Sequence, residues 1–544
     1  MSVRGATSSP ATSPALRAAS AGVVLALAAI LALPAGGREA YAQAAAPTPE
    51  AIRAAVAVHR RNHEMDVMGE LRELLAMPNI ASNVEDIRRN AEHLVRMMER
   101  RGIRARVLEL DGAPPAVYGE LTTPGATRTV VLYAHFDGQP VDGPGWLTDP
   151  WQPTLVAGRL EDGARIVPWA EATPPLDDEW RVYGRSASDD KSPIVAYLAA
   201  LDALRAAGIR PSVNLKFFLE GEEETGSPNL RRMLERYRDL LAADAWIFGD
   251  GPVDQSRRHQ IVHGVRGVMG LQMTVYGPAR VLHSGHYGNW APNPAVMLVR
   301  LLASMRDDEG RVTIPGFYDD VRPPTPAERE AIAALPPVEE TLARELVLGR
   351  VEGGGAERLP ARISMPALNL DGLSAGSVGD AARNAIPTEA TAALDIRLVP
   401  DQRPERIREA VEAHIRGQGF HIVYEEPSPE VLRAHPRVIR LTWDDGYAAI
   451  RTPPDLPVSR AVAATAEQVL GTSVLRVPTL GGSLPMSIFE EVLGVPLLIV
   501  PMVNHDNNQH APNENLRIRN LWDGILLYAG LIARLGVEWE GVGT

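Results

Sequence analysis

Histidine and carboxylate side chains stand at, or just beyond, the ends of short apolar runs in this sequence. Imidazole nitrogens and carboxylate oxygens are ligands that Zn2+, Mn2+ and Co2+ accept in proteins. Because the chain contains no cysteine, any bound metal must be held by oxygen and nitrogen. The residue types and their placement indicate a two-metal hydrolase site. Its candidate members are His135, Asp137, Asp189, Glu223, Glu224, Asp250 and His510.

The apolar runs must form the elements that position the residues of this site. Runs at 129–134, 213–218, 245–248 and 496–501 have the composition of buried strands and alternate with helical stretches. In an open α/β sheet the functional crevice lies outside the carboxyl ends of the strands, so residues distant in sequence converge there. We therefore predict an α/β fold in which a mainly parallel sheet has helices on both faces.

The pattern of apolar and polar residues in the sequence changes near Gly264. Beyond it, the alternating run 390–400 and the helical run 407–415 are typical of an α+β insert with one exposed sheet face. The Pro- and Glu-rich stretch 307–362 is interpreted as surface elaboration. The predicted divisions are a signal peptide at 1–42, a split catalytic domain at 43–263 and 453–544, and an inserted lid and dimerisation domain at 264–452.

Composition excludes some classes of partner. The chain has 544 residues and a formal net charge of −13, without a concentrated basic tract. Because phosphate binding needs clustered Lys and Arg, no nucleic-acid partner is expected. The length favours more than one domain, and a hydrophobic share of 45% is ample for a globular core.

The N-terminus has the pattern of a secretory signal. Arg4 and Arg17 precede the uncharged apolar segment 18–37, and Ala40-Tyr41-Ala42 stands before Gln43. We expect cleavage there and a secreted or periplasmic protein. An uncleaved anchor is the alternative, because the segment approaches the roughly 20 residues that span a bilayer. No later segment is long and apolar enough to cross a membrane, so no membrane partner is expected after cleavage.

Each chemical position also has a simpler explanation. Asp137 could cap the turn after a strand, and Asp189 with Asp190 could cap the following helix. The run 222–224 could be an exposed acidic turn, although clustered carboxylates repel one another unless a cation or proton intervenes. In an extended backbone His135 and Asp137 point to the same side, so Asp137 could hold one ring nitrogen while the other binds a metal.

The order of the motifs resembles a zinc metallopeptidase family. That family includes carnosine dipeptidase, glutamate carboxypeptidase, acetylornithine deacetylase and succinyl-diaminopimelate desuccinylase, and the chain is most similar to its dipeptidase branch. The resemblance covers nearly the whole mature chain. The motifs are AHFDGQP (134–140), GRSASDDKS (184–192), LEGEEETGS (219–227), FGD (248–250), LHSGHYGN (282–289), IRLVP (396–400), GGSLP (481–485) and HAPNE (510–514).

The resemblance implies two divalent metal ions per chain. His135, Asp189 and Asp250 would bind one ion. Asp189, Glu224 and His510 would bind the other, so that Asp189 bridges them. Three ligand carboxylates and a bridging hydroxide would balance two divalent charges with both histidines neutral. We expect Zn2+, with Mn2+ or Co2+ as alternatives, because the ligand types do not select among them.

The resemblance also implies a general base. The family's carboxylate pair directly precedes the TGS segment, which selects Glu223 and Glu224 rather than Glu222. Glu223 would then be the base, and Asp137 would orient His135. A metal-bound water has a pKa near 7, so Glu223 could take its proton and pass it to the leaving amine.

Further motifs imply substrate contacts. The family's histidine at the position of His283 reaches the active site of the partner subunit and stabilises the oxyanion, which implies a homodimer. Arg397 resembles the arginine that grips a substrate carboxylate. Asn384, Gly482 and Ser483 resemble further substrate-contacting positions. A hydrogen-bonded turn histidine and a surface strand arginine are the simpler explanations of His283 and Arg397.

We therefore predict an exported two-metal hydrolase that cleaves a dipeptide-like amide bond next to a free carboxylate, using a metal-bound hydroxide. An N-acyl-amino-acid deacylase or carbamoyl-amide hydrolase with the same centre is the alternative. A non-catalytic binding protein is a remote one. Thr479-Leu480 stands where the dipeptidase branch has an Arg-Glu pair, which puts the dipeptide specificity in question but not the metal centre.

Overall fold

The computed structural model describes residues 46–355 and 357–541. The predicted signal peptide, residues 1–42, lies outside the described residues. Within the described part of the chain, no helix has both the length and the apolar character needed to cross a bilayer.

A central eight-stranded sheet contains all of the predicted buried runs. Its strands are β1 (Arg104–Leu108), β2 (Ala116–Leu121), β3 (Thr129–His135), β7 (Asn214–Glu220), β8 (Ala245–Phe248), β9 (Gln260–Val262), β19 (Leu475–Val477) and β20 (Leu497–Ile499). Their spatial order is β1-β2-β7-β3-β8-β20-β9-β19. The neighbours β7, β3, β8 and β20 run parallel, whereas β1 and β2 add antiparallel strands at one edge.

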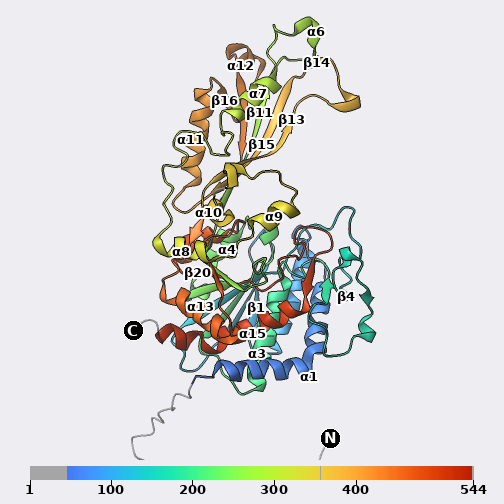
Figure 1. The fold of residues 1–544 in the computed structure, drawn as a ribbon, viewed down its shortest axis with the longest axis vertical. Helices are drawn as coiled ribbons and strands as arrows, with labels where there is room; N and C mark the ends of the chain where they lie inside the picture. Colours follow the sequence, from blue (N-terminus) through green and yellow to red (C-terminus); the bar gives the residue numbers. More distant parts are fainter. Residues whose placement is uncertain (1–45, 356, 542–544) are drawn as a thin grey trace, which may run out of the picture. The chain divides into compact units, whose positions relative to one another are not determined.

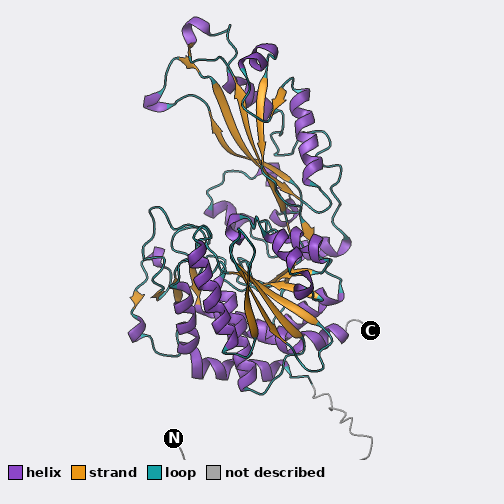
Figure 2. Ribbon diagram, turned by 180° about the vertical axis from the view of Figure 1, so that it is seen from behind, coloured by secondary structure: helices purple, strands orange, loops and turns teal. Residues whose placement is uncertain are grey.

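Helices cover both faces of this sheet (Figure 2). Alternation along β3 explains why: Val130 and Leu132 enter one apolar cluster, and Val131 and Tyr133 enter the other. The first cluster is closed by α1 (Pro49–Leu75), α2 (Val84–Glu99), α3 (Lys191–Ala206), α13 (Pro457–Leu470) and α15 (Ile518–Gly541). The second is closed by α4 (Leu230–Arg236), α5 (Arg238–Leu241) and α14 (Met486–Leu493).

Local sequence signals begin several helices. The Thr48 side chain accepts a hydrogen bond from the amide of Ala51 at the start of α1, which has proline in its first turn. Asn83 accepts from the amide of Asp86 at the start of α2. These caps satisfy backbone donors that have no partner within the helix.

A separate five-stranded sheet, partly labelled in Figure 1, is formed within the predicted insert. Its strands are β11 (Gly267–Tyr276), β13 (Ala367–Ser374), β15 (Glu389–Leu398), β16 (His421–Val423) and β17 (Val438–Trp443), in the order β13-β15-β11-β17-β16. One face forms an apolar core with α7 (Pro294–Ala303) and α11 (Pro404–Gly417). The other face is less buried, as the alternating pattern predicts.

Smaller elements complete the fold. A four-stranded sheet contains β4 (Thr154–Val156), β5 (Ile166–Val167), β6 (Arg181–Tyr183) and β21 (Asn515–Arg517). Two-stranded pairs are formed by β10 (Gly264–Val265) with β18 (Ile450–Arg451), and by β12 (Leu282–His283) with β14 (Ala385–Ile386). The short helices are α6 (Ser284–Tyr287), α8 (Pro326–Ala334), α9 (Glu339–Glu345), α10 (Leu359–Ile363) and α12 (Pro429–Ala434). Strands β10 and β18 pair with each other close to the two predicted limits of the insert, residues 264 and 452. These limits themselves stay a prediction.

Candidate metal centre

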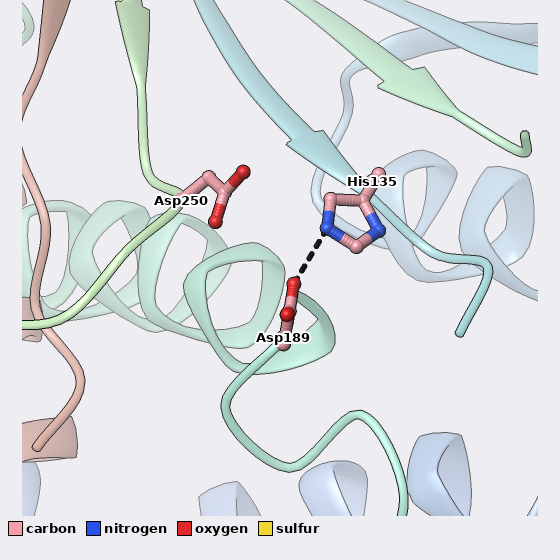
Figure 3. A group of neighbouring side chains, drawn as sticks. All are labelled: His135, Asp189 and Asp250. Atoms are coloured by element: carbon pink, nitrogen blue, oxygen red, sulfur yellow. Dashed lines mark hydrogen bonds and ion pairs between the residues drawn. The ribbon is translucent and has the colours of Figure 1, made fainter. Parts of the chain in front are cut away.

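The predicted ligands come together at the carboxyl edge of the central sheet. His135 is the last residue of β3, Asp250 follows β8, and Asp189 lies just before α3. Figure 3 shows these side chains converging from the strand ends and the helix start. His135 Nε2 lies 2.8 Å from Asp189 Oδ1, and ligand atoms of all three residues lie within 4.8 Å of one another.

A second group shares Asp189 with the first. His510 Nε2 lies 3.1 Å from Asp189 Oδ2 and 3.2 Å from Glu224 Oε2. Ligand atoms of these residues also lie within 4.8 Å of one another. Asp189 therefore offers one oxygen to each group. The His510 side chain is 56% exposed, so the centre is open to solvent on this side.

The charges of the centre fit divalent cations. Burial, followed by the negative charge of Asp189, raises the pKa of Asp250 to about 7. Burial also holds the pKa of Glu223 well above its usual range. Buried carboxylates that raise one another's pKa are stabilised when a cation lies between them. The imidazole and carboxylate donors fit Zn2+, Mn2+ or Co2+.

Neighbouring carboxylates raise the pKa of both histidines, and Asp189 acts on each of them. Burial alone would lower the pKa of His135, but hydrogen bonds with Asp137 and Asp189 outweigh it and raise that pKa well above the usual range. Hydrogen bonds with Asp189 and Glu224 raise the pKa of His510 to about 10. A divalent ion would compete with these protons for the same nitrogen lone pairs.

Asp137 connects His135 to the acidic turn. Asp137 contacts His135 Nδ1, the ring nitrogen that faces away from Asp189, through its backbone oxygen at 3.2 Å and its Oδ1 at 3.4 Å. Its carboxylate also accepts hydrogen bonds from the amides of Glu223, at 3.1 Å, and Glu224, at 2.9 Å. Asp137 therefore contacts the imidazole and also holds the turn that carries Glu223.

The acidic turn separates its carboxylates. Glu223 Oε2 lies 3.9 Å from His135 Nε2, and Glu224 Oε2 lies beside His510. Glu222 instead accepts hydrogen bonds from the backbone and side chain of Asn229. The turn is thus not a uniform acidic surface, because Glu222 faces away from the candidate ligands.

Helix capping does not explain the Asp189-Asp190 pair. Asp190 is at the N-cap position of α3 but makes no side-chain capping hydrogen bond. Its Oδ2 instead accepts from the backbone amide of His135 at 3.3 Å. Both carboxylates are directed at the centre rather than at the free amides of the helix.

Glu514 is a structural member of the centre that the sequence interpretation missed. It is fully buried. Its Oε1 accepts from the amides of Ser188 at 2.8 Å and Asp189 at 2.9 Å, while Oε2 binds the amide of Ser186 and Arg185 Nη1. Glu514 therefore holds the loop that presents Asp189. The available signal was an acidic residue inside the HAPNE motif, next to a buried strand.

Other polar contacts support the ligands. Asn79 Nδ2 donates to Phe136 O at 2.6 Å and to Ser186 Oγ at 2.9 Å, which connects the strand and loop carrying His135 and Asp189. Gln139 Nε2 donates to Glu224 Oε2 at 2.8 Å. The sequence interpretation assigned no role to Asn79 or Gln139.

The residues predicted to contact substrate lie in two separate parts of the structure. Arg397 Nη1 donates to Ser483 Oγ at 2.8 Å, and Gly482 is the preceding residue of the same turn. His283 and Asn384 lie together at β12 and β14, where Ser284 N donates to Asn384 O at 2.9 Å. Among the described residues, no hydrogen bond or ion pair joins His283 to the metal ligands.

Residues 131–534 match the family described as Peptidase family M20/M25/M40. The chain belongs to this family. It is therefore a metal-dependent peptidase, which confirms the predicted family, enzyme class and fold class.

Relatives and structures within this family match most of the chain. The Cys-Gly metallodipeptidase dug1 of Schizosaccharomyces pombe is 28% identical, and the alignment covers 78% of this chain and 83% of the relative. The Beta-Ala-His dipeptidase of Homo sapiens is 27% identical, covering 87% and 90%. The M20 family metallo-carboxypeptidase Sso-CP2 from Sulfolobus solfataricus superposes with a TM-score of 0.72 at 29% identity, covering 87% and 99%. Human carnosine dipeptidase 1 shares the fold, with a TM-score of 0.70 at 24% identity, covering 90% and 100%.

Proposed function

We propose that this M20 peptidase is a dipeptidase that cleaves the amide bond next to a free carboxylate. The observation that carries the proposal is the pair of overlapping ligand groups that share Asp189, with the Glu223 carboxylate beside them. The names of the relatives, a Cys-Gly metallodipeptidase and a Beta-Ala-His dipeptidase, support a dipeptide substrate.

Each candidate residue has a separate task in this proposal. His135, Asp189 and Asp250 would hold one divalent ion, and Glu224 and His510 would hold the other together with Asp189. The chemistry that such ions supply when bound is activation of water and polarisation of the scissile carbonyl.

Proton transfer is assigned to Glu223. Its carboxylate takes a proton from the attacking water and delivers it to the leaving amine. Asp137 keeps the His135 ring in place through Nδ1 and holds the amide of Glu223. One residue thereby contacts both the candidate ligand His135 and the backbone of the proposed base.

The substrate carboxylate is assigned to Arg397 and the turn at 481–483. The contact between Arg397 and Ser483 leaves other guanidinium donors for a planar carboxylate. The Sso-CP2 structure, at 29% identity, is named a metallo-carboxypeptidase. That name supports an enzyme that acts next to a free carboxyl end.

We further propose a homodimer in which His283 of the partner subunit stabilises the oxyanion. Within one chain His283 is exposed, and its Nδ1 accepts only from the amide of Gly285, at 3.1 Å, among the described residues. The strand β13 is an edge strand. Exposed apolar residues on β13, α7 and the segment between α6 and α7 would be covered by a second copy. They are Leu370, Leu373, Val296, Val299 and Trp290.

Export is proposed from the N-terminal pattern alone. Cleavage after Ala42 would leave Gln43 as the first residue of a secreted or periplasmic protein. Intact-mass measurement of the exported protein should give a chain that begins at Gln43. A chain that retains Met1 would contradict cleavage.

Substrate preference tests the proposed activity. Purified protein is supplied with Zn2+, Mn2+ or Co2+ and assayed on free dipeptides, N-acetyl amino acids and N-carbamoyl amino acids that share the same carboxyl-terminal residue. We expect the highest kcat/KM on a free dipeptide, loss of activity with a chelator, and recovery with metal. A preference for an N-acetyl or N-carbamoyl substrate would favour the deacylase or carbamoyl-amide hydrolase. Less than about one bound ion per chain, with no activity on adding metal, would favour a binding protein.

A further inference from the structure

Arg266 lies on the same face of the insert sheet as Arg397. Val268 pairs with Arg397 across β11 and β15. Arg266 is two residues before Val268, and side chains two residues apart in extended backbone point to the same face. This is the less buried face of the sheet, opposite the apolar core.

Both arginines bind the turn at 481–483. Arg266 Nε donates to Gly481 O at 3.2 Å, and Arg397 Nη1 donates to Ser483 Oγ at 2.8 Å. The backbone keeps the turn in place, because Leu480 N donates to Gly264 O at 2.8 Å. The two guanidinium groups are therefore brought to one short segment of chain.

The charges of the two arginines are not balanced equally. Arg397 Nε lies 2.8 Å from Asp395 Oδ2. Arg266 has no carboxylate at ion-pair distance among the described residues, and there its terminal nitrogens make no hydrogen bond to protein. Burial, followed by the positive charge of Arg397, lowers the pKa of Arg266, and the charge of Asp395 opposes this lowering without reversing it. A partly buried cation beside a like charge is stabilised by an anion.

This polar face extends toward the proposed base. Tyr447 forms a backbone bridge with Val268. Burial, followed by the charge of Glu223, raises the pKa of the Tyr447 phenol, whereas the charge of Arg397 opposes this rise. The charges of Glu223 and Arg397 therefore both act on the Tyr447 phenol, so this face of the insert sheet lies toward the proposed base.

We propose that Arg266 and Arg397 form a paired guanidinium site for the free carboxylate of the substrate, in which Arg266 supplies the uncompensated positive charge. The inference rests on the proposed peptidase reaction and deepens it by adding a specificity-determining residue. Arg397, already paired with Asp395, orients the carboxylate. Arg266 gives the site its net attraction for a negatively charged group.

The test compares a dipeptide with its carboxyl-terminal amide in wild type and Arg266→Gln. We expect wild type to prefer the free acid. The substitution should lower kcat/KM on the free acid about 10- to 100-fold, as expected for loss of a hydrogen bond to a charged group, and leave kcat/KM on the amide nearly unchanged. Metal content should stay at the wild-type value.

Two further variants separate recognition from folding. Arg266→Lys keeps the charge without the planar fork and should recover part of the preference for the free acid. Arg440→Gln, which removes an arginine paired with Glu426 on the same sheet, should keep the wild-type preference.

Equal losses on both substrates in Arg266→Gln, with no recovery in Arg266→Lys, would show that Arg266 only supports the turn and would overturn the inference. An active wild type without preference for the free acid would overturn it too, while leaving the peptidase reaction intact. A metal-loaded wild type inactive on all substrates would instead overturn the proposed function, and with it this inference.

Discussion

At the scale of single residues, the acidic turn after β7 gives three adjacent carboxylates three different environments. Glu222 is held by Asn229, Glu223 lies near His135, and Glu224 lies beside His510. The turn is held by Asp137, which accepts the amides of both Glu223 and Glu224. Chemical roles are therefore separated by backbone geometry rather than by residue type.

Replacing Glu223 by Gln should remove turnover but not metal. Its carboxylate is assigned to proton transfer, which contributes about 100- to 10,000-fold in rate, so kcat should fall within that range. Metal analysis should still find the wild-type content. Glu222→Gln is the matched control, because its carboxylate contacts Asn229 instead. A larger loss of kcat in the Glu222 variant would reverse the assignment of the base.

Replacing Glu514 by Gln should weaken metal binding. The new amide nitrogen would face backbone N–H donors that the carboxylate now accepts, so the loop carrying Asp189 would shift. Loss of a group that orients a ligand commonly costs about 10- to 100-fold in metal affinity, measurable by competition with a chelator. Glu491→Gln, at an exposed carboxylate paired with Arg231, should bind metal as wild type does. Unchanged affinity in Glu514→Gln would remove its positioning role.

At the scale of elements, helix α8 connects the 307–362 stretch to the rest of the chain. Glu328 completes a capping box with Thr325 at the start of α8. It also binds Arg451 of β18 at 3.1 Å in a buried ion pair. Arg451 in turn donates to Thr479 Oγ1. Thr479, one of the two positions that depart from the dipeptidase pattern, therefore contacts an arginine that is paired with α8.

Glu328→Gln should destabilise the protein in a pH-dependent way. Breaking a buried ion pair leaves Arg451 uncompensated and costs about 3 kcal/mol. Burial raises the pKa of Glu328, but Thr325, Arg451 and Arg322 outweigh it, and the folded pKa lies below 4.5. The stabilisation is therefore complete above about pH 4.5 and is lost as the pH falls through the lower folded pKa.

Denaturant unfolding of wild type and Glu328→Gln over a pH series checks this expectation. The difference in unfolding free energy should be constant near neutral pH and should shrink below about pH 4.5. Glu330→Gln, on an exposed position of the same helix, should match wild type throughout. A difference that grows on acidification would contradict the assigned sign.

At the scale of the whole molecule, the proposed homodimer would complete the metal centre with a histidine from a second chain. The candidate metal ligands lie at strand ends and loops beside the central sheet, whereas His283 lies on the β12–β14 pair of the insert and is exposed. In a symmetric dimer the exchange is reciprocal, so each proposed site would receive one histidine from the other subunit.

Mixing inactive variants tests this exchange. His283→Ala and Glu223→Gln should each be nearly inactive alone. After subunit exchange, a mixed dimer has one site with an intact Glu223 that receives His283 of the partner subunit, so an equal mixture should recover about a quarter of wild-type activity. His286→Ala, whose ring centroid lies 4.6 Å from that of His283, should retain activity on its own. Failure to recover activity, with dimers present by light scattering, would argue against a shared site.

The local sequence pattern was sufficient to predict those elements whose determining contacts are local or whose side chains are completely buried. The runs at 129–134 and 245–248 form β3 and β8 because an unbroken apolar segment can satisfy its backbone only inside a covered sheet. The same residues predicted which strand ends would carry His135 and Asp250. The antiparallel edge β1–β2 was not predicted, because the partly exposed β1 has no continuous apolar signal.

The sequence by itself therefore determined the family, the fold class and the set of candidate ligands, since these depend on residue types at the ends of buried strands. Only the tertiary structure decided that Asp189 faces both ligand groups, that Glu514 holds its loop, and that Arg266 and Arg397 meet at one turn. These contacts join residues that are far apart in the chain. Their geometry depends on how sheets and loops pack, and residue spacing carries no information about that packing.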